Sequence, residues 1–140
     1  MAVLHEAAIP FHDLGVDPAH VELAMGYAPG DSPAPLHELL AATLAEAPSR
    51  LEPRGGLLVL PPDEAAVLET GLRLRGAWLD TGALIASLLD TATTCAVFAA
   101  TAGPALDAWS RDVLADGDPL AAFVIDALGT VVAERSIDCL

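Results

Sequence analysis

Apolar residues recur every three or four positions in several stretches of the chain, and this spacing predicts helices. The segment Asp17–Tyr27 opens with an acidic N-cap residue and a proline at the first helical position. A second helix is predicted over 33–51, where leucines recur at helical spacing; Ser32 can cap it, and Pro48 and Pro53 close it. The same spacing predicts three more helices, over residues 80–90, 105–116 and 118–140.

Short apolar runs bounded by glycine and proline predict strands between these helices. The run 71–76 is typical, because Leu72 and Leu74 alternate with Arg73 and Arg75. Three other strands are predicted over residues 55–62, 65–69 and 93–101. The fold class is therefore α+β, and the length suits one domain spanning residues 1–140. The last helix still runs at Leu140 without a cap or a glycine, which is typical of the front part of a longer domain.

The net charge of the chain limits the kinds of molecule that it can bind. The chain has twenty acidic residues and six basic ones, all arginine, for a formal net charge of −14. Such a surface repels phosphate backbones and anionic lipids, which excludes nucleic acid and membrane surfaces as partners. It favours a cationic ligand or a basic protein face.

The sequence shows neither a secretory signal nor a redox-active cysteine motif. Cys95 and Cys139 form no CxxC pattern, and the N-terminus lacks the basic end and apolar core of a secretory signal. We therefore expect a cytoplasmic protein with reduced thiols. The apolar stretch Gly82–Gly103 resembles a membrane span, but Asp90 and several threonines lie within it, so two elements joined by a turn explain it better.

Motifs for catalysis or metal binding are not evident. The segment Thr93–Trp109 predicts a strand that leads directly into a helix. A phosphate-binding loop needs several glycines, but Gly103 is alone and Pro104 lacks a backbone N–H donor. A structural turn is therefore favoured over a phosphate-binding loop. His5, His12, His20 and His37 match no compact metal motif. The serines lack a nucleophile-elbow context. No catalytic or metal-ligating residue is predicted.

One polar stripe offers a candidate binding group. Asp126, Thr130, Glu134 and Asp138 are spaced four apart and share one face of the last predicted helix. The opposite side is apolar, carrying Leu120, Val124, Leu128, Val131 and Val132. The stripe either faces water, or one of its carboxylates faces a cleft and holds a cationic ligand group.

The order of the elements resembles the activation (reactivation) domain of cobalamin-dependent methionine synthase and its stand-alone relatives. The resemblance is firm from Cys95 onward, over "VFAATAG", "LDAW" and "GDPLAAFVIDALGTVVAE", and looser upstream, over "LAMGYAPG" and "LRLRGAWLDTGALIASLLD". It implies a curved domain built around a twisted antiparallel sheet with flanking helices. The chain corresponds to the N-terminal portion of that domain.

The resemblance also implies a function. Domains of this family bind S-adenosylmethionine and present it to cobalamin carried by a partner domain. An electron from a flavodoxin-like donor and the methyl group of S-adenosylmethionine then convert inactive cob(II)alamin to methylcobalamin. The chain would thus be an accessory part of a methyltransferase of methionine biosynthesis. Aligning "ALGTVVAE" places the family's ligand-contacting glutamate at Glu134, where a buried carboxylate–ammonium pair would contribute about 2–5 kcal/mol.

One departure from the family leaves an alternative open. The Arg-Pro-x-Pro-Gly-Tyr-like loop, which supplies most ligand contacts in the family, has no counterpart in the 140 residues. The alternative is a non-catalytic docking subunit for a corrinoid protein, or an acidic helical adaptor. An exposed apolar edge left by the missing segment would favour homo-oligomers.

Overall fold

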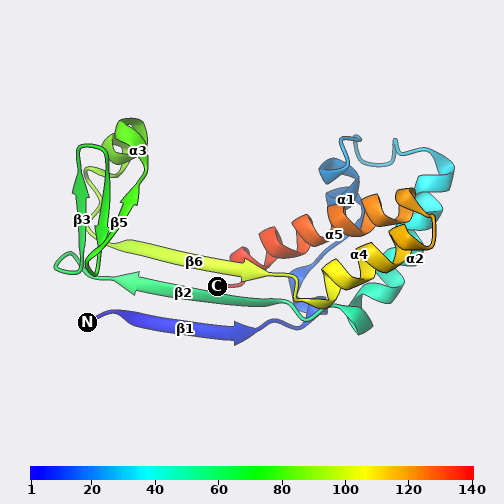
Figure 1. Cartoon of the computed structure of the whole chain (residues 1–140), viewed down its shortest axis with the longest axis horizontal. Helices are drawn as coiled ribbons and strands as arrows, with labels where there is room; N and C mark the ends of the chain where they lie inside the picture. Colours follow the sequence, from blue (N-terminus) through cyan, green and yellow to red (C-terminus); the bar gives the residue numbers. More distant parts are fainter. The chain divides into compact units, whose positions relative to one another are not determined.

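The computed structural model describes residues 1–140 and has the predicted α+β architecture, with two three-stranded sheets (Figure 1). By its contacts the chain divides into two compact units: unit 1 comprises residues 1–6 and 56–98, and unit 2 comprises residues 7–55 and 99–140. The elements in chain order are β1 (Val3–Ala8), a 3₁₀ helix η1 (Phe11–Leu14), α1 (Pro18–Ala24), α2 (Ala34–Arg50), β2 (Arg54–Leu60), β3 (Ala65–Leu68), β4 (Gly71–Leu74), β5 (Ala77–Asp80), α3 (Gly82–Leu89), β6 (Cys95–Thr101), α4 (Ala105–Ala115) and α5 (Pro119–Asp138).

All five predicted helices and all four predicted strands are confirmed. The apolar stretch Gly82–Gly103 is divided between α3 and β6, as expected for two elements joined by a turn. No helix has the length and apolar character needed to cross a membrane. Sequence reasoning missed β1, η1 and β5.

The boundaries of α2 differ from the prediction. The helix runs through Pro48 to Arg50, and Pro33 rather than Ser32 occupies the N-cap position. Proline at position 48 removes one intrahelical hydrogen bond. The helix nevertheless continues, because Ala47 and Leu51 are buried in the core on either side of Pro48 and the Leu51 N–H donates to the Ala47 carbonyl at 2.9 Å.

Unit 1 contains an antiparallel sheet of order β3-β4-β5, in which Val67 pairs with Leu72. Arg75 and Gly76 connect β4 to β5, and both have positive φ (48° and 88°). Positive φ at both central residues is the geometry of a two-residue type I′ hairpin loop, whose twist matches that of the strands. The buried apolar core of this unit is small and consists of Leu60, Leu72 and Leu74.

Unit 2 is built around α5, which packs against α4, α1, α2 and η1. Asp118 caps α5 by accepting a hydrogen bond from the Ala121 N–H at 2.9 Å, and Pro119 occupies the first turn. The Arg135 guanidinium donates to the Leu14 carbonyl at 2.9 Å, which ties the last turns of α5 to η1. The apolar core of this unit is larger and includes Leu14, Val21, Leu40, Ala47, Trp109, Val124, Ile125, Leu128 and Val132.

The second sheet has the order β1-β2-β6, and its neighbouring strands run in opposite directions (Figure 1). Each of its strands has residues in both units. In unit 2 the Glu52 N–H, just before β2, donates to the Ala102 carbonyl, just after β6, at 3.2 Å. The end of β6 is thereby fixed where the chain turns into α4.

Candidate functional site

A hollow of about 580 Å³ lies in unit 2 where the turn after β6 meets α4 and α5. The turn contributes its backbone and small side chains, α4 contributes its first turn, and α5 contributes its middle. The lining residues are Ala100, Thr101, Ala102, Gly103, Pro104, Leu106, Asp107, Asp126, Gly129, Thr130 and Ala133. This hollow brings together the turn and part of the polar stripe that the sequence singled out separately.

Close packing requires glycine at the turn. Gly103 has φ of 97°, a conformation that favours glycine. A Cβ at this position would lie 2.8 Å from the Glu52 carbonyl oxygen, too close for a side chain. The Gly103 N–H donates to Thr101 Oγ1 at 3.1 Å. The turn therefore positions β6 and α4, and its outer side forms one wall of the hollow.

The opposite wall is set by the approach of α4 to α5. A Cβ on Gly129 would collide with the Leu106 side chain, so the two helices come together at a glycine. Asp126 precedes this position by three residues and Thr130 follows it directly, which places both at the hollow. The Thr130 hydroxyl donates to the Asp126 carbonyl oxygen at 3.3 Å, and the Asp126 carboxylate stays exposed.

The electrostatic character of the hollow is anionic. Asp107 and Asp126 supply two exposed carboxylates, and no arginine or histidine lines the hollow. α4 starts here, and its first backbone N–H groups carry the partial positive charge of a helix N-terminus. No side chain caps these groups, and the Leu106 N–H donates to the Gly103 carbonyl at 3.4 Å. The hollow therefore offers carboxylates to a cationic group and helix amides to an anionic one.

Glu134, the residue predicted to contact a ligand, is exposed and does not line the hollow, although its neighbour Ala133 does. The whole polar stripe of α5 is exposed, while Val124, Leu128, Val131 and Val132 on its other side are buried. Leu120 departs from the predicted apolar side and stays 45% exposed. An exposed ion pair contributes about 0.2–1 kcal/mol, so the larger figure for a buried pair does not apply to Glu134.

A buried carboxylate that sequence reasoning missed lies elsewhere in unit 2. Glu22 is 2% exposed; it accepts hydrogen bonds from the Gly30 N–H at 2.7 Å and from the Ser32 hydroxyl, and its carboxylate lies 3.6 Å from His37 Nδ1. These donors, the Gly30 amide first, hold the pKa of Glu22 below its usual value. The carboxylate is satisfied by the loop after α1, so its role is to order that loop. Ser32 thus donates its hydroxyl hydrogen bond to Glu22 and does not cap α2.

The remaining candidate groups are dispersed. His12 lies 3.0 Å from Asp13, and His20 completes a capping box with Asp17 at the start of α1. No three histidine, cysteine, aspartate or glutamate side chains gather in a way that would hold a metal ion. Cys95 and Cys139 are free thiols.

Comparison with solved structures finds a chain described as the crystal structure of the MetH reactivation domain bound to AdoHcy, S-adenosylhomocysteine. The two chains superimpose with a TM-score of 0.68 at 16% sequence identity, over 98% of the present chain. The fold predicted by resemblance is thereby confirmed. The present chain spans about half (53%) of the matched chain. No protein-family profile and no curated protein sequence matches the present chain.

Proposed function

We propose that this chain is an S-adenosylmethionine-binding module that serves cobalamin carried by a partner domain, in the manner of a methionine synthase reactivation domain. The observation that carries the proposal is the fold likeness along nearly the whole chain to a reactivation domain bound to S-adenosylhomocysteine. That molecule is what remains of S-adenosylmethionine once its methyl group has been transferred.

The hollow in unit 2 suits parts of this ligand. S-adenosylmethionine carries an α-ammonium and a sulfonium, and Asp107 and Asp126 would face such cations. Its carboxylate would accept hydrogen bonds from the backbone N–H groups at the start of α4, since helix N-termini bind anions. The 140 residues hold no Arg-Pro-x-Pro-Gly-Tyr-like loop, so we expect weaker binding than a complete site would give.

When bound, S-adenosylmethionine would supply the methyl group, and reductive methylation also needs one electron from a flavodoxin-like donor. This chain's own part is to bind and orient the ligand, since the cobalt chemistry belongs to the cobalamin. The acidic surface would also favour encounter with a basic face of the corrinoid protein.

Calorimetric titration of the 140-residue chain with S-adenosylmethionine tests the binding step. We expect Asp126→Asn to weaken binding by about 1.4- to fivefold, the range for an exposed charge pair. Glu134→Gln tests the residue predicted from the family. Glu38→Gln is the matched control, because it removes one exposed charge from the same unit without lining the hollow. Equal affinities for all four proteins would refute the assignment of this hollow.

Function is tested by adding the chain to a methionine synthase that lacks its own reactivation domain and is trapped as cob(II)alamin. With S-adenosylmethionine and a reductant, return of methylcobalamin would support the proposal, and omission of the chain is the control. No return beyond that control would argue against it.

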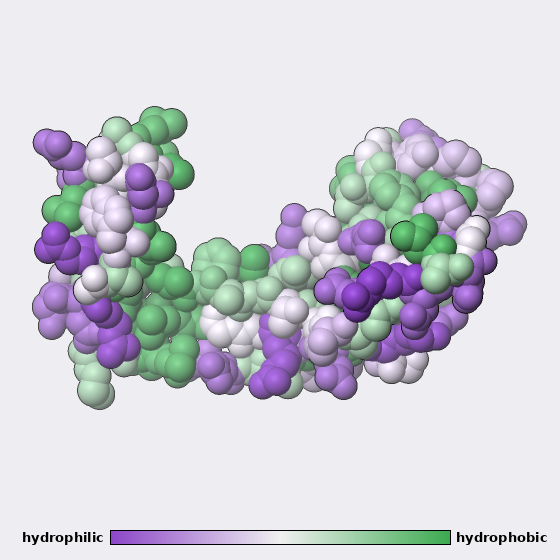
Figure 2. All heavy atoms as spheres, viewed as in Figure 1, coloured by the Kyte–Doolittle hydropathy of each residue, from purple (hydrophilic) through white to green (hydrophobic).

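A second candidate is a docking subunit for a corrinoid protein without a small-molecule site. The observation in its favour is the exposed apolar face of α3, on which Leu84 and Leu88 are 75% and 73% exposed. Figure 2 shows hydrophobic residues gathered over parts of unit 1, including α3. Capture of a corrinoid protein that does not depend on S-adenosylmethionine, together with no calorimetric binding, would favour this candidate.

A further inference from the structure

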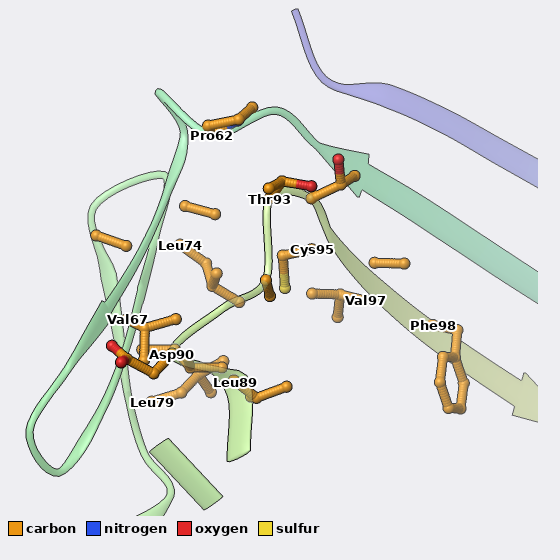
Figure 3. Close-up of a pocket in the computed structure, with 16 residues that line it drawn as sticks. Pro62, Val67, Leu74, Leu79, Leu89, Asp90, Thr93, Cys95, Val97 and Phe98 are labelled. Atoms are coloured by element: carbon orange, nitrogen blue, oxygen red, sulfur yellow. The ribbon is translucent and has the colours of Figure 1, made fainter. Parts of the chain in front are cut away.

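A second hollow, of about 590 Å³, lies wholly within unit 1. Its walls come from β3, β4, β5 and β6, from the end of α3, and from Pro62 and the loop 90–94 (Figure 3). This volume falls in the range of about 300–1,000 Å³ that is typical of small-molecule sites.

The interior of this hollow is apolar. Val67, Leu72, Leu74 and Leu89 line it, and all four belong to the small core of unit 1 or pack against it. Figure 3 shows the sulfur of Cys95 directed toward Leu74 and Val97. The unit buries only three large side chains of its own, so the apolar wall faces water unless another molecule fills the space.

The polar groups of the hollow lie together on the loop after α3. Asp90, Thr93 and Thr94 are exposed there, and Asp90 forms no ion pair within unit 1. Neither arginine of this unit lines the hollow: Arg75 lies 3.2 Å from Glu64, and Arg73 pairs across the sheet with Trp78. An apolar wall with a single carboxylate at its edge admits a neutral or cationic molecule and disfavours an anion.

We propose that this hollow binds a small aromatic or aliphatic amine, with the apolar body against Val67, Leu74 and Leu89 and the amine at Asp90. Burial of the apolar body supplies most of the affinity, because exposed apolar surface is removed from water on both sides. The carboxylate supplies the preference for a cation. This site lies in a different unit from the proposed S-adenosylmethionine site and does not depend on it.

Cys95 provides the readout. In a Cys139→Ser background Cys95 is the single thiol, and its alkylation by N-ethylmaleimide reports occupancy of the hollow. The probes are three naphthalenes of similar size: the cationic 2-naphthylmethylamine, the neutral 2-methylnaphthalene and the anionic 2-naphthoate. At about nine times Kd, a ligand slows alkylation about tenfold. We expect the amine to protect Cys95 most strongly, the neutral probe less and the anion least.

Variants separate the site from nonspecific effects. Asp90→Asn should remove the advantage of the amine over the neutral probe while keeping protection by both. Val97→Trp should fill the hollow and abolish protection, whereas Leu68→Trp, on β3 but outside the hollow, should leave protection unchanged. Equal protection by the anion, no protection by any probe, or protection by S-adenosylmethionine in place of the amine would overturn the proposal.

Discussion

Substituting Gly103 by alanine should destabilise the chain more than the same change at Gly117, although both glycines have similar positive φ (97° and 87°). An added Cβ at Gly117 meets nothing within 4 Å. At Gly103 it would lie 2.8 Å from the Glu52 carbonyl oxygen and 3.1 Å from the Glu52 nitrogen. The comparison therefore isolates the cost of close backbone packing from the cost of backbone conformation.

The magnitudes follow from these contacts. An L-residue held in the left-handed region costs about 1–2 kcal/mol, and this is the whole expected effect at Gly117. At Gly103 the Glu52 backbone must also move, which weakens the hydrogen bond from its N–H to the Ala102 carbonyl. That loss adds about 1 kcal/mol, and repacking adds more. We expect a total of about 2–4 kcal/mol for Gly103→Ala.

Urea denaturation followed by the fluorescence of Trp109 measures both changes. Trp109 belongs to the core of unit 2, which contains both glycines, and Trp78→Phe removes the other tryptophan. Gly26→Ala is a further control, since Gly26 has φ of 90° and open space around its Cβ position. Equal destabilisation by all three substitutions would show that the turn does not pack on Glu52 and would refute the reasoning.

Two further predictions concern unit 2. The pKa of Glu22 is lowered from 4.5 by the Gly30 amide, so its charged form stabilises the fold above that pKa and the benefit is lost as the pH falls through the lowered value. Glu22→Gln should therefore reduce the free energy of unfolding at pH 7, and the two proteins should converge in acid. A difference in unfolding free energy that does not change with pH in urea denaturation would contradict this. Gly129→Ala should lower the free energy of unfolding by about 1–3 kcal/mol, because the added methyl group meets Leu106. In a double-mutant cycle, Leu106→Ala should recover part of that loss. Strict additivity of the two substitutions would show that the helices do not meet there.

Local signals account for the elements that the sequence predicts. Asp17-Pro18 and Asp118-Pro119 mark the starts of α1 and α5, and both aspartates accept the expected capping hydrogen bonds. β1 was missed because all six of its residues are exposed and show no alternation of buried and exposed positions. β5 is likewise exposed along its length and is held by its pairing with β4. β1 pairs with β2, which is distant in the sequence, so no local pattern reveals it. β5 pairs with the adjacent β4, but its short, exposed run has no alternating apolar pattern that would mark it as a strand.

Local sequence patterns also predict only part of the candidate site. The spacing of four correctly places Asp126, Thr130 and Glu134 on one exposed face of α5. Which of them meets the hollow depends on where α4 crosses that helix, and the crossing is set by Gly129 against Leu106. At about 1.5 Å per residue, Glu134 lies about 12 Å along the axis from Asp126. Weaker binding in Asp126→Asn alone would therefore place the ligand's cation at the crossing, whereas weaker binding in Glu134→Gln alone would place it toward the end of α5 and outside the hollow.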